Sequence, residues 1–264
     1  MHHSALFVTT VPATLEAFLL PFSAHFRARG WRIDALANEA THRIRLLQAF
    51  DTLYDITWSR NPLALGDHFD TWNRVQRIVV EGGYDIVHVH TPIAAFVTRF
   101  ALRSMAPSDR PAIIYTAHGF HFYRGQGRLG HAAFRTLERT AAPWTDYLVT
   151  INREDYDAAM AFSGIDRDHV RYIPGIGVDV DAYSESVVDP ADPSRVRAEL
   201  GVAPDAFMLT MVAEFSPVKR HSHILAALAK VQREDVVLVL AGAGPLEDET
   251  RTLAESLGVT DRVR

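Results

Sequence analysis

Two short apolar runs, residues 85–89 and 112–115, constrain the fold more than any other feature of the chain. Both runs are too short for a helix and are rich in β-branched residues, which is typical of buried parallel strands. Between them, from Pro92 to about Arg103, apolar residues recur at helical spacing, and Pro92 suits the first turn of a helix. The pattern predicts a strand–helix–strand unit, and therefore a parallel sheet covered by helices.

Polar residues gather where these two predicted strands end. The first strand closes with His88, His90 and Thr91, and the second with Thr116, His118, Gly119 and His121. In an open parallel sheet, ligands bind in the crevice at the carboxyl ends of the strands. Both clusters are therefore expected to border a ligand site.

Strands and helices alternate along most of the chain. Further strands are predicted at residues 5–9, 31–36, 53–57, 147–151 and 170–173, and helices at 15–29, 67–81, 132–142 and 154–162. Residues 10–14 are predicted to form the loop after the first strand, and Pro21 is expected to kink the helix that follows. The alternation predicts an α/β fold, a doubly wound sheet with helices on both faces.

Residues 184–194 interrupt this alternation with prolines, acidic residues and little to bury. We predict a first domain at 1–185, a linker at 186–194 and a second domain from 195 onward. Asp192 and Pro193 are expected to start a helix, with Asp192 as its N-cap. Strands at 207–213 and 236–241 and helices at 218–232 and 246–257 then follow, and 259–264 approaches another strand. We expect a second domain of the same kind, of which only the first part is present.

The composition excludes several classes of protein. A net charge of −5 and a pI near 6.2 argue against a nucleic-acid partner, and the absence of cysteine excludes disulfides and thiolate metal sites. No signal peptide is recognisable and no run approaches the roughly 20 apolar residues of a membrane span, so a cytoplasmic location is expected. The aromatic helix near 15–31 leaves two interpretations, a core helix or a peripheral contact at the inner face of the membrane.

His88 and His90 lie two residues apart on a strand and should face the same side of the sheet. They could hold a metal with His118 and His121, as in a metal-dependent hydrolase, or pack and hydrogen-bond at the strand end. No third metal ligand is clearly spaced from His88 and His90, so the packing interpretation is preferred. No metal and no cofactor are predicted.

The dipeptide His118-Gly119 gives a sharper signal, because glycine lets the backbone approach a ligand or take a positive φ. The residues after it, Phe120, Phe122, Tyr123 and Arg124, are predicted to form an aromatic wall with a cation suited to a sugar or an anion. The alternative is a structural loop tip.

Two glycine- or lysine-containing loops of the second part have different predicted roles. Residues 216–221, which include Lys219 and Arg220, begin a predicted helix with basic side chains, a placement that makes sense if an anion binds there. Gly242 and Gly244 are followed by three acidic residues that would repel a pyrophosphate, so these glycines are expected to serve close packing instead.

The order and spacing of five motifs resemble glycosyltransferase family 4, the retaining sugar-nucleotide transferases of the two-domain GT-B fold. The motifs are residues 88–92 (HVHTP), 116–122 (TAHGFHF), 173–179 (IPGIGVD), the strand and loop that end at Lys219, and 239–245 (VLAGAGP). The branch that it resembles most is the bacterial one that builds capsular polysaccharides, exopolysaccharides or lipid-linked glycans. The resemblance implies an acceptor domain followed by a nucleotide-sugar domain with Rossmann-like folds.

This resemblance also implies roles for individual residues. His118 would lie in the cleft near the transferred sugar as the catalytic residue. Gly119, Lys219 and Arg220 would contact the nucleotide-sugar donor, which is expected to be a UDP-sugar. The cleft and the glycan or polyprenyl-linked acceptor would be contacted by Thr10, Thr14, His90, Thr91, His121 and Arg124.

The chain departs from the family pattern at two places. Glu214 occupies the position where the family usually pairs an arginine with Lys219, and the family's Glu-(seven residues)-Glu motif has no counterpart before residue 264. The activity implied is hexosyl or N-acetylhexosaminyl transfer, with this truncated chain expected to be inactive. A non-catalytic sugar-binding remnant is the remaining alternative to the transferase and the hydrolase.

Overall fold

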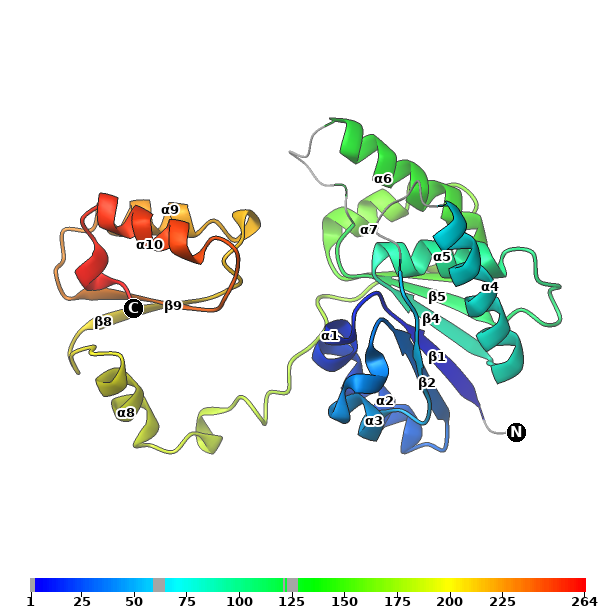
Figure 1. Ribbon diagram of the computed structural model, residues 1–264, viewed down its shortest axis with the longest axis horizontal. Coiled ribbons are helices and arrows are strands. Elements are labelled where there is room, and N and C mark those ends of the chain that lie inside the picture. The colour runs from blue at the N-terminus through cyan, green and yellow to red at the C-terminus, as the bar shows by residue number, and fades with distance from the viewer. Residues whose placement is uncertain (1–2, 59–64, 121, 123–127) are drawn as a thin grey trace. The chain divides into compact units, whose positions relative to one another are not determined.

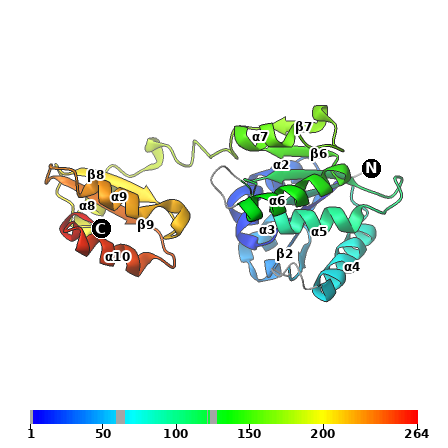
Figure 2. The same cartoon turned by 90° about the horizontal axis from the view of Figure 1, so that it is seen from above.

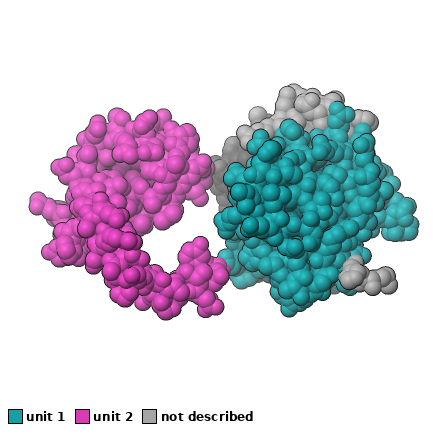
Figure 3. Space-filling model, turned by 60° about the horizontal axis from the view of Figure 1, so that its bottom comes forward, with its two compact units in different colours: residues 1–177 teal, residues 178–264 magenta. Residues whose placement is uncertain are grey.

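The computed structural model describes residues 3–58, 65–120, 122 and 128–264 (Figure 1). The chain divides into two compact units, Met1–Gly177 and Val178–Arg264, which Figure 3 colours separately. Each unit is described by itself. The domain limits expected from the sequence, 1–185, 186–194 and 195–264, stay a prediction.

The first unit is built on a sheet whose described strands are all parallel and follow the order β3-β2-β1-β4-β5-β6-β7. Figure 2 shows β2 toward one end of this unit and β6 and β7 toward the other. The strands are β1 (Ser4–Val8), β2 (Arg32–Ala37), β3 (Leu53–Asp55), β4 (Ile86–His90), β5 (Ala112–Ala117), β6 (Tyr147–Thr150) and β7 (Val170–Tyr172). This confirms the predicted doubly wound α/β fold. The strand order reverses between β1 and β4, where such folds bind ligands.

Helices cover the sheet of the first unit on both faces (Figure 1). The α-helices are α1 (Pro12–Thr14), α2 (Leu20–Arg27), α3 (Ile44–Ala49), α4 (Leu65–Gly82), α5 (Pro92–Leu102), α6 (Arg128–Ala141) and α7 (Arg153–Ala159). The described residues of the first unit form two hydrophobic cores. On one face of the sheet, β1 and β2 pack against the segment 15–20 and against α3. On the other face, the sheet packs against α4, α5 and α7. Short 3₁₀ turns lie at Ala40–His42, Ala142–Trp144 and Arg167–His169.

A buried ion pair ties α5 and α6 to the central sheet. Arg99, 1% exposed, donates to Glu138 at 2.9 Å, and the Tyr115 hydroxyl donates to the same carboxylate at 3.0 Å. The Arg99 guanidinium also lies 4.3 Å from the centre of the Tyr115 ring. Because both charges are paired and hydrogen-bonded, their burial is tolerated.

The segment after β1 differs from its prediction. Residues 12–14 are helical rather than a loop, and the predicted kinked helix is instead a π-helical stretch, η1 (Leu15–Leu19), followed by α2. Pro21 has no N–H to donate to the preceding turn, so the α-helical hydrogen-bond pattern is interrupted just before it. Thr14, predicted to lie in the loop, is the last residue of α1.

The side chains of this segment favour the core interpretation over the membrane one. Leu15 and Leu19 are buried, and Phe18, Leu20 and Phe26 pack against the same core, whereas Phe22 is 46% exposed. Within the described parts of the chain, no helix has the length and apolar character that crossing a membrane would need. The neighbouring helix α3 was not predicted, because its exposed Ile44 and Leu47 blur the helical pattern.

The second unit contains a parallel pair of strands, β8 (Phe207–Val212) and β9 (Val236–Ala241), and Val263 forms a parallel bridge to Leu238 of β9. Its helices are α8 (Asp192–Glu199), α9 (His221–Leu228) and α10 (Glu247–Ser256), with 3₁₀ turns at Glu185–Val187, Pro217–Lys219 and Thr260–Arg262. Its small core gathers α9, α10 and β9. The predicted second α/β unit is therefore present.

Two predicted helix starts in this unit were wrong. The N-cap of α8 is Ala191, and Asp192 is instead the first helical residue, with its carboxylate 2.6 Å from the Arg195 guanidinium. The helix predicted at 218–232 begins only at His221, because Arg220 adopts a left-handed conformation with φ of 60°. Lys219 ends a separate 3₁₀ turn rather than lying in the first turn of the helix.

Candidate functional site

Three histidines line one face of the sheet where β4 and β5 end. His88 and His90 have ring centres 4.1 Å apart, which confirms that they share a face. Nδ1 of His90 lies 3.0 Å from Nε2 of His118, the residue that follows β5, and Nε2 of His88 lies 2.8 Å from the Thr116 hydroxyl. The predicted polar ends of the two strands are thus joined by direct hydrogen bonds.

Burial keeps these imidazoles neutral near pH 7. It lowers the pKa of His88 to about 3, with a smaller contribution from His118, and it lowers the pKa of His90 well below the ordinary value. Burial also lowers the pKa of His118. A neutral imidazole has one donor and one acceptor nitrogen, so these side chains can orient a ligand by hydrogen bonding without contributing charge.

One nitrogen on each of two rings has no partner among the described residues. These atoms are Nε2 of His90 and Nδ1 of His118, and both are buried. A buried polar atom without a partner is costly, so a ligand or water that completes it is favoured. His118, which is only partly buried, is the better placed of the two to meet a ligand.

The ring of Phe18 fixes the plane of His118. The two rings are stacked with centres 5.1 Å apart and an interplanar angle of 20°. Phe18 comes from the π-helical stretch η1, and such local widenings of a helix are frequent at functional sites. The sequence interpretation placed Phe18 in a helix that either packs in the core or contacts a membrane, and gave it no role at this site. A contact between one residue and a histidine far away in the chain leaves no periodic pattern in the sequence.

Thr10 and Thr91 connect the carboxyl ends of β1 and β4, where the strand order reverses. The Thr91 hydroxyl accepts from the backbone N–H of Thr10 at 3.0 Å, and the two hydroxyl oxygens are 2.6 Å apart. Thr91 has φ of 63° and ψ of 136°, a conformation that is strained for a β-branched residue. Strain of this kind is concentrated at functional sites.

The loop after His118 is held by a side chain that the sequence interpretation missed. Gly119 takes a positive φ, 121°, which is one of the two alternatives expected for it, and the N–H of Phe120 donates to Asp155 at 2.9 Å. Asn152 donates to the same carboxylate at 2.7 Å and accepts from the Asp155 N–H at 2.8 Å. Asn152 and Asp155 are spaced like a capping box at the start of α7, and this spacing was the sequence signal that could have identified Asp155.

The prediction that Phe120 and Phe122 form an aromatic wall facing a ligand was wrong. Phe120 and Phe122 are each 5% exposed and stack on one another with centres 4.8 Å apart, inside the core beside Phe162. They stabilise the loop rather than face a ligand. His121, Tyr123 and Arg124, predicted for the same wall or cleft, lie outside the described residues. Thr14 makes no side-chain hydrogen bond within the described chain.

In the second unit, Lys219 and Arg220 are exposed and precede the first turn of α9. Neither has an ion pair within the described part of the chain. His221 is 4% exposed, stacks on Phe215 with ring centres 4.4 Å apart, and has no described partner for either ring nitrogen. Free helix N–H groups beside two cations can bind an anion.

Gly242 and Gly244 serve close packing, as predicted. A Cβ on Gly242 would lie 2.0 Å from the carbonyl oxygen of Ala213, and one on Gly244 would lie 2.6 Å from the backbone of Phe215. The contact brings the loops after β8 and β9 together, which confirms close packing as a role of these glycines.

A metal centre finds little support in the described residues. Among them, no group of three or more histidine, aspartate or glutamate side chains is arranged to hold a metal ion. His90 and His118 hydrogen-bond each other, and His88 bonds to Thr116. His121, the fourth member of the alternative hydrolase site, lies outside the described residues.

Comparison with known proteins gives consistent likenesses. The family described as Glycosyltransferase Family 4 matches residues 15–182, and the one described as Glycosyl transferases group 1 matches residues 193–264. The chain is 33% identical over 267 residues to EpsD of Bacillus subtilis, a protein named as a glycosyltransferase, and covers 67% of its length. It is 26% identical over 172 residues to an Escherichia coli UDP-Gal:α-D-GlcNAc-diphosphoundecaprenol α-1,3-galactosyltransferase, with 64% of this chain and 43% of that enzyme aligned.

Solved structures share the fold. A glycosyltransferase from Rickettsia africae superposes with a TM-score of 0.75 at 14% identity, over 100% of this chain and 67% of that one. WaaG, a glycosyltransferase involved in lipopolysaccharide biosynthesis, gives a TM-score of 0.67 at 16% identity, over 98% of this chain and 69% of that one. The chain thus spans about two thirds of the length of these proteins.

Proposed function

The chain belongs to glycosyltransferase family 4, and we propose that it carries the acceptor half and part of the donor half of a retaining transferase of cell-surface polysaccharide synthesis. The donor is a nucleotide sugar, a UDP-sugar, and the group moved is a hexosyl or N-acetylhexosaminyl unit. The acceptor is a glycan or a polyprenyl-linked saccharide. The E. coli relative, named for a UDP-Gal donor and a diphosphoundecaprenol acceptor, supports this choice of substrate class.

The hydrogen bond between His90 and His118 is the observation that carries the proposal. It places a neutral imidazole at the carboxyl ends of β4 and β5, with Nδ1 free of any described partner. We assign His118 the role of orienting the transferred sugar through that nitrogen, with His90 and Phe18 fixing its ring. Holding reacting groups in position accounts for a large part of enzymatic rate, so a rigidly held hydrogen-bonding group fits transfer chemistry.

Thr10, Thr91 and Gly119 are assigned to the edge of the same crevice. Thr91 joins β1 to β4 across the reversal point of the sheet, and Gly119 leaves space beside His118 because nothing lies within 4 Å of where its Cβ would be. Thr14, His121 and Arg124 remain predicted acceptor contacts. In the second unit, Lys219 and Arg220 are assigned to the donor diphosphate at the start of α9, where Glu214 replaces the family's usual arginine.

We further propose that the 264-residue polypeptide alone does not complete the transfer. Throughout the second unit, all of whose residues are described, the sheet consists of β8 and β9 with one bridge from Val263. A nucleotide crevice forms where the strand order of a doubly wound sheet reverses, and two successive strands have no such point.

The experiment compares residues 1–264 with a fusion in which the part of EpsD without a counterpart in this chain continues the sequence. Both are assayed for release of UDP from several UDP-sugars with polyprenyl-linked and simple glycan acceptors. We expect turnover from the fusion and none from the short chain. Turnover by the short chain would refute the second proposal, and a well-folded fusion that turns over no donor would refute the first.

A further inference from the structure

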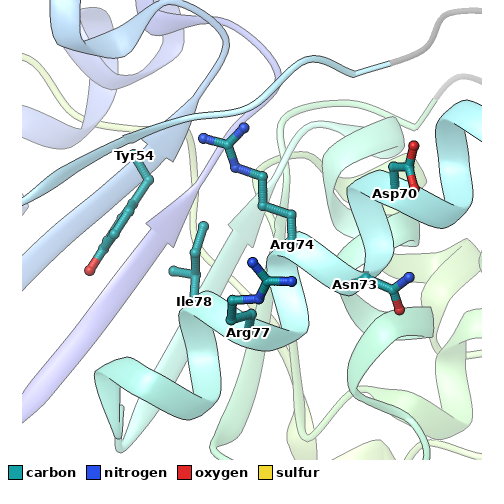
Figure 4. A pocket seen from close by; sticks show the side chains of 6 residues that line it. All are labelled: Tyr54, Asp70, Asn73, Arg74, Arg77 and Ile78. Atoms are coloured by element: carbon teal, nitrogen blue, oxygen red, sulfur yellow. The ribbon is translucent and has the colours of Figure 1, made fainter.

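A cavity of about 540 Å³ lies between the edge strand β3 and helix α4, away from the histidine cluster. Figure 4 shows its lining residues, which are Tyr54, Asp70, Asn73, Arg74, Arg77 and Ile78. β3 is separated from β4 by three strand spacings, which is roughly 14 Å at about 4.8 Å per spacing. The cavity is therefore a separate feature of the first unit.

Two arginines give the cavity its charge. Arg74 and Arg77 lie one helical turn apart on α4, both exposed, and Figure 4 shows Arg74 extending from the helix toward the strand that carries Tyr54. Neither makes a hydrogen bond or ion pair with any described residue, and Asp70, one turn before Arg74, is not within ion-pair distance of it. Like charges at this spacing repel each other, so a bound anion would stabilise the pair.

Other arginines of the same unit show what a satisfied guanidinium looks like. Arg27 contacts Asp51 at 3.0 Å and Arg110 contacts Asp146 at 2.9 Å, and both also donate to backbone carbonyl groups. The cavity pair has no such partners on the described chain. Arginine presents a planar fork of donors that fits phosphate oxygens two at a time, which makes phosphate the best match for the free pair.

Tyr54 supplies a rigid wall. Its hydroxyl oxygen lies 3.4 Å from that of Tyr84, and the Tyr84 hydroxyl donates to the buried Asp34 at 2.6 Å. This chain of contacts fixes the Tyr54 ring, while buried Ile78 provides an apolar surface and Asn73 an amide at the rim. A ring wall beside two cations suits a ligand with a phosphate and a compact polyol, such as a sugar or glycerol group.

We propose that this cavity binds a phosphate ester, with the phosphate held by Arg74 and Arg77 and its polyol part placed against Tyr54. The site is independent of the proposed transferase function, because none of its residues belongs to the histidine cluster or to the start of α9. Two sources share this chemistry: a soluble sugar phosphate and the headgroup of an anionic phospholipid.

The test uses the 264-residue chain and two matched double variants. Arg74→Gln with Arg77→Gln removes both cations of the cavity, and Arg135→Gln with Arg139→Gln removes two exposed arginines of α6 that lie one turn apart and have no described partner. Glutamine is a good helix former, so both variants should keep the fold, which circular dichroism verifies. Both lose the same charge, which controls for net electrostatics.

Calorimetric titrations at fixed ionic strength use inorganic phosphate and glucose 1-phosphate, and flotation uses phosphatidylcholine vesicles with and without phosphatidylglycerol. We expect binding of at least one probe that weakens about tenfold or more in the cavity variant and stays unchanged in the α6 variant. Soluble probes bound in this way identify a sugar-phosphate site, and retention only on phosphatidylglycerol vesicles identifies a headgroup site. Equal weakening in both double variants, or no binding of any probe, would overturn the proposal.

A third variant tests the ring wall. Tyr54→Leu should weaken glucose 1-phosphate more than inorganic phosphate, because only the sugar contacts the ring, whereas Tyr54→Phe should leave both unchanged. Equal effects of Tyr54→Leu on the two soluble probes would remove the ring from the site.

Discussion

The backbone N–H of Phe120 donates to the carboxylate of Asp155 at 2.9 Å, which ties the loop after β5 to the first turn of α7. Asn152 donates to the same carboxylate at 2.7 Å, so both elements are held by one side chain that is 5% exposed. The loop carries His118 and Gly119 just before Phe120. The orientation of the candidate catalytic histidine thus depends on a residue more than thirty positions further along the chain.

Asp155→Ala is expected to lower the free energy of unfolding of the first unit by about 1–3 kcal/mol, because it leaves the buried Phe120 N–H unpaired. Urea denaturation measures the change. Asp155→Asn keeps an acceptor oxygen and should cost less. Asp157→Ala is the control, since this exposed residue of the same helix makes only a surface ion pair with Arg153. A cost for Asp155→Ala no larger than for Asp157→Ala would contradict the anchoring role.

The histidine cluster should make the fold sensitive to acid. His88 and His90 have a lower pKa in the folded chain than in the unfolded one, so they take up protons on unfolding. The free energy of unfolding therefore falls as the pH falls below about 6.5, and continues to fall toward the folded pKa near 3 of His88. Between pH 7 and pH 5 the loss from His88 should be about 2 kcal/mol, and His90 should add a loss of the same sign.

Urea titrations at a series of pH values provide the measurement. The double variant His88→Asn with His90→Asn should show a shallower fall between pH 7 and pH 5 than the unsubstituted chain. His25→Asn, an exposed histidine of α2, should leave the slope unchanged. An identical slope in the double variant would show that the acid sensitivity comes from other groups.

The strained backbone of Thr91 makes a separate prediction about two substitutions. Thr91→Ala removes the hydroxyl that accepts from Thr10 but keeps a Cβ at φ of 63°. Thr91→Gly removes both the hydroxyl and the strain, which is of order 1–3 kcal/mol. The glycine variant should therefore be the more stable of the two in urea denaturation. An alanine variant that matches or exceeds it would show that the conformation is not strained.

Much of the α/β fold was predictable because each strand is a compact apolar run and each helix has its own periodic face. Residues 236–241 were predicted and observed as the same strand, β9. The GT-B type of the fold followed from the resemblance and agrees with the structures that share it. Two of the failures occurred where one residue changes the local backbone: Pro21 produces a π-helical turn, and the left-handed Arg220 delays the start of α9.

The candidate site was predictable in part. Its polar residues could be found because they follow predicted strands, so His90, His118, Thr10 and Thr91 were named from sequence and are brought together as two hydrogen-bonded pairs. Phe18 and Asp155 were missed because their roles depend on contacts between elements far apart in the chain. The aromatic wall failed for the opposite reason: a run of aromatic side chains after a strand does not reveal whether it faces a ligand or the core.

The last prediction separates the two halves of the proposed transferase. In the EpsD fusion, His118→Ala should lower kcat by about 10²–10³ with little change in KM for the donor, because it removes a positioned polar group near the transferred sugar. Lys219→Ala should chiefly raise KM for the donor, since its exposed ammonium can hold the diphosphate before and during transfer alike. Steady-state kinetics with varied UDP-sugar give both constants.

Two control variants test whether His118 acts on kcat and Lys219 acts on KM for the donor. Lys230→Ala removes the other lysine of the second unit, an exposed residue beyond the end of α9, and should change neither constant. His118→Asn keeps a hydrogen-bonding side chain and should recover part of the lost kcat, which a merely structural histidine would not require. If His118→Ala retains near-normal kcat while its unfolding curve is unchanged, His118 plays no part in the transfer. If Lys219→Ala lowers kcat and leaves KM unaltered, the lysine acts on the transition state and its assignment to donor binding is wrong.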